Sequence, residues 1–294
     1  MAAPPQIFDQ VLWRRRLDRA ARSADMPDFL LRRVEADLAE RLAIVKRPFR
    51  RAACLGAYSS TTAKLVFDIT GAPDIINVAV SGEIARGIDP PAVLADPGIV
   101  PFEVESLDLI VSCLTLQFEN DLPGVLVQAR RALKPDGLFL AAIIGGQSLN
   151  ELRTAWLIAE EEVTGGASPR VAPFADVRDC GALLQRAGFA LPVVDSDTLT
   201  VNYSSPLALM QELKAMGASN VLAARRRVPV TRGLLLRAAE VYASRFANAE
   251  GRIPATFEII TMTAWAPDAS QPKPLKPGSA AVSLADVLGK KPGN

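Results

Sequence analysis

The stretch PFEVESLDLIVSCLTLQFENDLPGVLVQARRALKPDGLFLAAIIGGQSLNELR, residues 101–153, decides the fold class of this chain. Its apolar run over 107–116 is nearly unbroken, which is typical of a strand that is covered on both faces, as in a parallel sheet. A helix is predicted over 122–133, because Pro123 is tolerated near a helix start. The sequence KPDG at 134–137 ends that helix and turns the chain, and 138–144 is predicted as the next buried strand.

The same alternation of strand and helix extends toward the N-terminus. Strands are predicted at 52–56, 75–80 and 93–95, with a helix over 61–68, and two helical pieces within 7–47 are separated by Pro27. Alternating elements of this kind indicate an α/β fold with a doubly wound, mostly parallel sheet and N-terminal helices.

The second half of the chain adds helices and two strands of a different kind. Ser148 and Glu151 form the pattern of a capping box for a helix to about 163. Further helices are expected over 176–187 and after Thr231. The strands at 198–203 and 257–265 include alternating residues, so we expect late antiparallel strands at one edge of the sheet.

The expected domain organisation follows from these elements. Residues 1–48 form an N-terminal helical segment, and 49–266 form the main domain, with helical insertions at 148–187 and 206–247. Residues 267–294 are rich in Pro, Lys, Gly and Ser and are expected to be an extended or disordered tail.

Composition excludes several kinds of site. The chain of 294 residues has no histidine, which excludes His-based catalysis and His-ligated metals, and its three cysteines are too far apart for a zinc cluster. We expect them to be buried thiols in a reducing compartment. A net charge of +1 gives no reason to expect nucleic acid, and no apolar run approaches the roughly 20 residues of a membrane span.

Several longer motifs then point to a family. The order PF, LDLIV, helix, LKPDG and strand resembles the second half of class I S-adenosylmethionine-dependent methyltransferases. The finer motifs resemble one branch, the family of NADH dehydrogenase (complex I) assembly factor 5 and its alphaproteobacterial relatives. They are NDLPG (120–124), AEEEVTGGASPRVAPFADVRDCGALLQRAGFALPVVD (159–195) and GRIPATFEIITMTAWAP (251–267).

The resemblance implies a class I methyltransferase-like fold, S-adenosyl-L-methionine as cofactor and a protein partner, an NADH dehydrogenase subunit in respiratory complex I assembly. It also implies a cytoplasmic location in a bacterium, with contact at the inner face of the membrane left open. The sequence leaves the catalytic residues and the oligomeric state open.

The resemblance places the cofactor at the carboxyl ends of the strands. The implied cofactor-binding residues are Gly56, Ala57, Tyr58, Ser81, Asp96 and Leu114.

The chain departs from the family pattern at this cofactor site. Tyr58 and Ser60 stand where the family has glycines, and Val80 stands where an acid would accept hydrogen bonds from the ribose. Losing two such bonds would weaken binding roughly 10²-fold. The alternative interpretation of 56–62 is a strand-to-helix turn whose hydroxyl residues cap the next helix.

Four further residues are candidates for contact with a substrate or partner, and each has a structural alternative. Glu119, Asn120 and Asp121 form either a substrate-facing loop or a helix entry, and Arg170 is either a partner contact or a surface arginine. The run Arg225–Arg227 is expected to face solvent. The N-terminal basic helix either covers the cofactor cleft, touches anionic lipid or packs on the core.

Two functions remain in competition. One is an S-adenosylmethionine-dependent methyltransferase or a related protein-modifying enzyme. The other is a non-catalytic assembly protein that keeps the fold and its partner-facing segments but has lost the cofactor.

Overall fold

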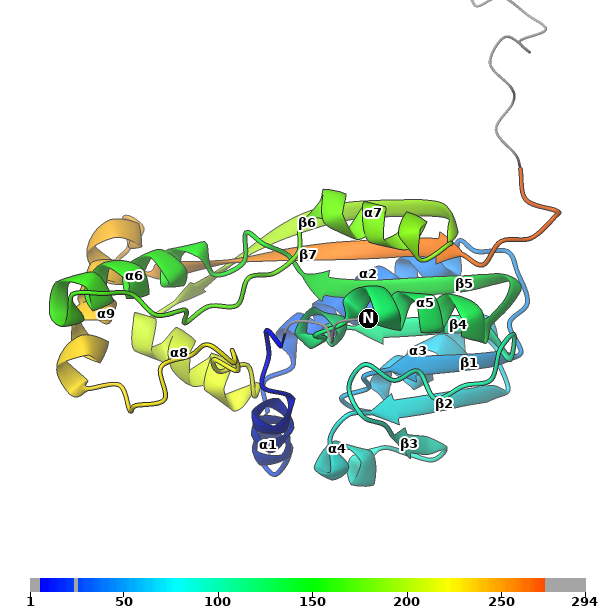
Figure 1. Cartoon of the computed structure of the whole chain (residues 1–294), viewed down its shortest axis with the longest axis horizontal. Coiled ribbons are helices and arrows are strands. Elements are labelled where there is room, and N and C mark those ends of the chain that lie inside the picture. The colour runs from blue at the N-terminus through cyan, green and yellow to red at the C-terminus, as the bar shows by residue number, and fades with distance from the viewer. Residues whose placement is uncertain (1–5, 24–25, 273–294) are drawn as a thin grey trace, which may run out of the picture.

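The computed structural model describes residues 6–23 and 26–272 and shows a sheet with helices on both faces (Figure 1). Within these residues the sheet has seven strands in the order β3-β2-β1-β4-β5-β7-β6. They are β1 (Arg51–Leu55), β2 (Asp74–Ala79), β3 (Ala92–Leu94), β4 (Leu107–Cys113), β5 (Leu133–Ile144), β6 (Ala190–Tyr203) and β7 (Ile253–Trp265). The first five pair in parallel, and β7 is antiparallel to β5 and β6. This confirms the predicted fold class.

Neighbouring side chains of a strand point to opposite faces of the sheet. In the parallel part both sets are apolar, and helices cover both faces. Through residues such as Val111, one face packs on α2 (Phe29–Ala43) and α3 (Thr61–Thr70). Through residues such as Ile110, the other face packs on α5 (Leu122–Ala132) and α7 (Val177–Arg186).

The three cysteines lie within these layers as free, buried thiols. Burial raises the pKa of Cys54 to about 12 and that of Cys180 to about 11, so both stay protonated at neutral pH. The prediction of ordinary buried thiols is confirmed.

Strands β6 and β7 continue beyond the parallel strands, and three helices gather at their far ends (Figure 1). These helices are α6 (Asn150–Thr164), α8 (Pro206–Ala215) and α9 (Arg232–Phe246). Thr231 caps α9 as predicted, because its side chain accepts a hydrogen bond from the Leu234 N–H. The first half of β6 was not predicted, since Pro192 and Asp195 weaken its strand pattern; an edge strand tolerates such residues.

The predicted capping box of α6 is wrong. The Ser148 hydroxyl instead donates to the Glu258 carbonyl at 3.1 Å and accepts from the Glu258 N–H at 2.9 Å. The Glu151 carboxylate accepts a hydrogen bond from the Thr256 hydroxyl. Both side chains are therefore used to attach α6 to β7, and Leu149, with a left-handed φ of 55°, begins the helix without a side-chain cap.

The segment 134–137 ends α5 as predicted but does not leave the sheet. It belongs to β5, where the pairing with β4 shifts register between Leu107 and Leu109. Asp136 has a left-handed φ of 60°, and its N–H donates to the carbonyl of Ala266. The predicted turn is thus an irregularity within a strand, held in place by the chain after β7.

The N-terminal helix α1 (Gln10–Ala21) packs against α4 (Gly82–Gly87), near the carboxyl ends of β2 and β3. The residue before it, Asp9, donates its N–H to the Val221 carbonyl at 2.8 Å, and Phe8 forms an antiparallel bridge with Leu222. None of the helices in the described ranges combines the length and hydrophobicity of a bilayer span.

We propose that the domain organisation follows the expected bounds, with the segment 1–48, the body 49–266 and helical insertions at 148–187 and 206–247. Most of the expected tail, from residue 273 onward, lies outside the described residues.

Candidate functional site

The loop after β1 comes very close to the end of β4. Gly56 has a φ of 69°, and a Cβ added there would lie 2.3 Å from the Thr115 side chain. The Thr115 hydroxyl donates to the Gly56 carbonyl at 2.8 Å, and the Ala57 N–H donates to the Val78 carbonyl at 2.9 Å. Only glycine fits at this position, because both the backbone angle and the contact exclude a side chain.

Tyr58 reaches from this loop across to β4. Its hydroxyl donates to the Leu114 carbonyl at 2.9 Å, and the Gln117 amide donates to the same carbonyl at 2.6 Å. Leu114 has a left-handed φ of 53°, a strained value for a side chain of this size. Burial raises the pKa of Tyr58 to about 12, so its hydroxyl remains a donor. Tyr58 therefore connects the ends of two strands.

At the end of β2, where the family pattern has an acid, the nearby carboxylate is that of Asp18 in α1. Val80 is buried, and the Ser81 hydroxyl donates to Asp18 of α1 at 2.5 Å. The Asp18 carboxylate also accepts from the Glu83 N–H at 3.2 Å, and Ser81 caps α4 by accepting from Ile84. The ribose position of the family pattern is thus apolar, and its neighbouring hydroxyl is already bonded within the chain.

Three further contacts hold α1 across the strand ends. Arg14 forms an ion pair with Asp96 after β3, and Arg22 forms one with Glu83 at 2.7 Å. The Trp13 ring packs on Phe118 with a centroid distance of 5.1 Å. The exposed ion pairs contribute little individually, so the packing of Trp13 and the Asp18–Ser81 bond are the main attachments.

The space between Gly56, Val80 and Asp96 is nearly closed. Its volume is about 20 Å³, enough for about one water molecule. Glu119 forms one of its walls with 9% of its surface exposed, and burial raises the pKa of this carboxyl to about 7. A nucleoside is much larger than this space, and the carboxyl end of β2 has no acid that could hold a ribose.

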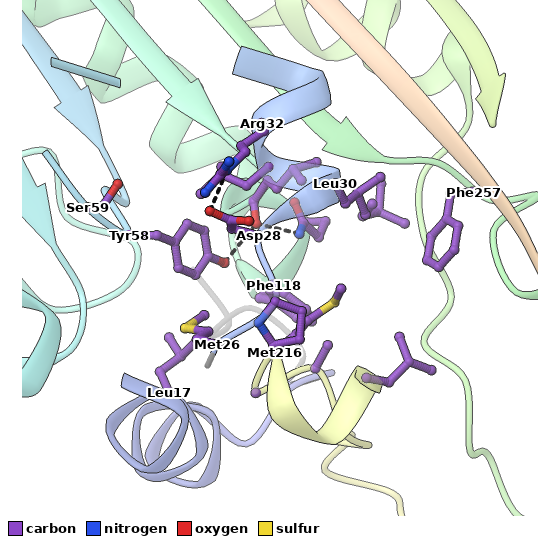
Figure 2. Close-up of a pocket in the computed structure, with 18 of the residues that line it drawn as sticks. Leu17, Met26, Asp28, Leu30, Arg32, Tyr58, Ser59, Phe118, Met216 and Phe257 are labelled. Atoms are coloured by element: carbon purple, nitrogen blue, oxygen red, sulfur yellow. Dashed lines mark hydrogen bonds and ion pairs between the residues drawn. The ribbon is translucent and has the colours of Figure 1, made fainter. Parts of the chain in front are cut away.

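Tyr58 lines a much larger pocket, which lies between α1, α2 and the end of α8 (Figure 2). Its volume of about 590 Å³ is within the range of roughly 300–1,000 Å³ for ligand pockets. Most of its walls are apolar; they include Trp13, Leu17, Met26, Leu30, Tyr58, Phe118, Met216 and Phe257. Figure 2 shows Asp28 and Arg32 at its edge, where they form an ion pair at 2.6 Å.

Two buried polar side chains stand out in the wall of this pocket. Glu35 is 3% exposed, accepts a hydrogen bond from the Thr62 hydroxyl at 2.6 Å, and has a pKa raised by burial. Gln117 is 9% exposed, and its Oε1 has no hydrogen-bond partner among the described residues. Leaving a buried acceptor unpaired costs about 1–3 kcal/mol. A ligand that donates a hydrogen bond to Gln117 Oε1 would remove this cost.

The other predicted contact residues are engaged within the chain. Asn120 pairs with the backbone of Phe8 through both a donor at 3.0 Å and an acceptor at 2.8 Å. Asp121 caps α5 by accepting from the Gly124 N–H at 2.9 Å. Arg170 is an ion-pair partner of the buried Glu160 and lies 4.5 Å from the centre of the Trp156 ring. None of these three residues lines the 590 Å³ pocket.

Sequence reasoning missed Asp18, Glu35 and Gln117. Only Glu35 carried a signal, since it is an acid inside the buried stripe of α2 beside Val34. The described residues contain no group of three or more metal-ligating side chains.

Comparison with known proteins agrees with this architecture. The family described as "Methyltransferase domain" matches residues 52–141. The fold resembles the YcgJ protein of Bacillus subtilis, with a TM-score of 0.55 and 14% identity over 79% of this chain and 99% of that one. It also resembles phosphoethanolamine N-methyltransferase 2 of Haemonchus contortus, solved with S-adenosyl-L-methionine, with a TM-score of 0.52 and 14% identity over 87% of this chain and 60% of that one.

The relatives found by sequence comparison have a higher sequence identity to this chain than these structures. The malonyl-[acyl-carrier protein] O-methyltransferase of Halorhodospira halophila is 32% identical, over 88% of this chain and 89% of the relative. The mitochondrial arginine-hydroxylase NDUFAF5 is 38% identical in Danio rerio, over 96% of this chain and 89% of the relative, and 39% identical in Homo sapiens, over 97% and 84%. With this identity over nearly its full length, the chain belongs to the family of the arginine-hydroxylase NDUFAF5, on the fold of a class I methyltransferase.

Proposed function

We propose that this chain is an assembly protein of respiratory complex I that binds a protein partner, an NADH dehydrogenase subunit, without using S-adenosyl-L-methionine. The family supports a role in assembly and a protein partner. We further propose that it acts in the bacterial cytoplasm, at the inner face of the membrane.

One observation carries the proposal concerning the cofactor. The nucleoside end of the site is a space of about 20 Å³. The Ser81 hydroxyl at the end of β2 already donates its hydrogen bond to Asp18 of α1. A nucleoside that uses Ser81 and Asp96 would need Asp18 to leave Ser81 and Arg14 to leave Asp96. The cofactor's binding energy would have to offset all of these losses, with no ribose acid to add to it.

The second candidate function is a protein-modifying enzyme that acts on a side chain held in the 590 Å³ pocket. It is favoured by the position of the pocket at the strand ends, where α/β folds bind ligands, and by the unpaired Gln117 acceptor in its wall. The relatives with the name arginine-hydroxylase point the same way.

Calorimetric titration with S-adenosyl-L-methionine and S-adenosylhomocysteine tests the cofactor proposal. We expect no heat of binding with the wild-type chain. A double variant, Asp18→Ala with Val80→Asp, frees Ser81 and supplies an acid at the end of β2, and is expected to gain weak binding. Micromolar binding of either compound by the wild type would refute the proposal and favour the enzyme.

Co-purification tests the partner separately. The tagged full chain, expressed in a bacterium that has complex I, is expected to recover an NADH dehydrogenase subunit before the complex is complete. Recovery of no such subunit, from cells in which the complex is being assembled, would contradict the role in assembly whatever the calorimetry shows.

A further inference from the structure

A second hollow lies behind the wall of the pocket shown in Figure 2. Its volume is about 620 Å³, and residues of α1, α6, α8 and the segments 170–174 and 218–230 line it. Leu149, Phe174 and Leu213 line both spaces, so one apolar wall separates them. We call this second hollow the arginine groove.

The floor of the arginine groove is apolar. It includes Leu152 and Trp156 of α6 and Met210 of α8. At its rim Val228 and Val230 are 57% and 40% exposed. Exposed aliphatic side chains beside a hollow of this size suit the insertion of bulky apolar side chains of another molecule.

The polar lining has one sign of charge. Five arginines line the groove, and no Asp or Glu does. They are Arg16, Arg170, Arg225, Arg226 and Arg227.

Some of these charges are neutralised within the chain. Arg170 pairs with Glu160, and Arg225 pairs with Asp9 at 2.9 Å, whereas Arg16 donates only to a backbone carbonyl, that of Asn220. Arg226 and Arg227 are exposed and form no ion pair with any described residue. Burial and the nearby Arg225 lower the pKa of Arg16, which agrees with a positive local potential.

We propose that the arginine groove is the docking site for an acidic segment of the protein partner, with a bulky apolar side chain flanked by Asp or Glu. The inference rests on the proposed function in one respect, that the partner is a protein. A hollow of about 620 Å³ with an apolar floor can receive individual side chains, whereas a flat lipid surface would touch only its rim. The excess of arginine selects acidic flanking residues, since complementary charge favours the encounter and disfavours basic segments.

The test measures binding of labelled peptides to the full chain by fluorescence anisotropy. The probe is a 12-residue peptide of Leu, Phe and Glu, and its counterpart has Lys in place of every Glu. We expect the wild type to bind the acidic probe and not the basic one. The double variant Arg226→Glu, Arg227→Glu is expected to lose at least about ten-fold in affinity, because each substitution replaces an attraction by a repulsion.

A matched control has the same change of charge elsewhere. Arg131→Glu with Arg186→Glu alters two exposed arginines on α5 and α7, on the opposite side of the sheet from α2. This control is expected to keep wild-type affinity. Equal binding of the acidic and basic probes, or an equal loss in both double variants, would overturn the proposal. So would binding to vesicles of phosphatidylglycerol that depends on Arg226 and Arg227 when the acidic peptide does not bind.

Co-purification then separates this inference from the proposed function. Loss of the NADH dehydrogenase subunit in the Arg226→Glu, Arg227→Glu variant alone supports the groove as the docking site. Full recovery by that variant would overturn the groove and leave the proposed function standing. If the wild type recovers no subunit, the proposed function fails, and the peptide titration still decides whether the groove selects acidic segments.

Discussion

The buried carboxyl of Glu119 makes the stability of the fold depend on pH. Burial raises its pKa from 4.5 to about 7, with Arg14 and the Gly98 N–H acting in the opposite direction. Its folded-state pKa therefore lies above its unfolded-state pKa. The stabilisation is fully present below pH about 4.5, because the carboxyl is then protonated in both states, and it is lost as the pH rises through about 7.

The magnitude follows from the two values. One pKa unit corresponds to about 1.36 kcal/mol, so a rise from 4.5 to about 7 gives about 3 kcal/mol. Glu119→Gln removes the titration and keeps the shape. We therefore expect the variant to gain about 3 kcal/mol in unfolding free energy relative to the wild type between pH about 4.5 and about 8.

Urea unfolding of both proteins at several pH values measures this difference. Glu250→Gln, at an exposed acid after α9, is the control and is expected to follow the wild type at every pH. The relevant quantity is the difference in unfolding free energy between variant and wild type, because the contributions of the other titrating groups cancel in this difference. A gap that stays constant over this pH range would refute the reasoning that Glu119 is held neutral by burial.

Three further predictions concern a close contact, a pair of hydrogen bonds and the burial of the thiols. Gly56→Ala is expected to cost about 3 kcal/mol or more in unfolding free energy, because the new Cβ meets Thr115. Its control Gly251→Ala, at a similar φ in open space, is expected to cost about 1 kcal/mol. Equal losses in urea titrations would argue against the steric account. Ser148→Ala should cost about 2 kcal/mol, since it removes two hydrogen bonds to Glu258, and a loss under about 0.5 kcal/mol would contradict this. All three thiols should resist Ellman's reagent at pH 8 until the chain is denatured, and any rapid reaction in the native state would contradict their burial.

The parallel part of the fold was predictable because local signals and the final structure agree there. The first seven residues of the nearly unbroken apolar run at 107–116 form β4, and Pro123 lies in the first turn of α5. The exceptions are residues whose partners are distant in sequence. Ser148 has the local pattern of a helix cap, yet its hydroxyl donates its hydrogen bond to Glu258 of β7, more than a hundred residues away.

The candidate site was predictable only in part for the same reason. The positions of Gly56 and Leu114 at adjoining strand ends follow from the order of strands. That Asp18 bonds to Ser81 could not be derived, because the docking of α1 depends on the tertiary packing of Trp13 and on the bridge between Phe8 and Leu222. Periodicity gives the buried face of a helix but not the surface that it meets.

The attachment of the N-terminus has a consequence for the order of folding during synthesis. Phe8 and Asp9 are synthesised long before their backbone partners, Val221 and Leu222, which lie in the loop after α8. At about 5–20 residues per second, α1 must wait many seconds for these partners. The parallel strands β1 to β5 are complete well before then. The nascent chain therefore passes through a stage in which β1 to β5 have been synthesised and α1 still lacks the backbone partners that help to hold it over the strand ends.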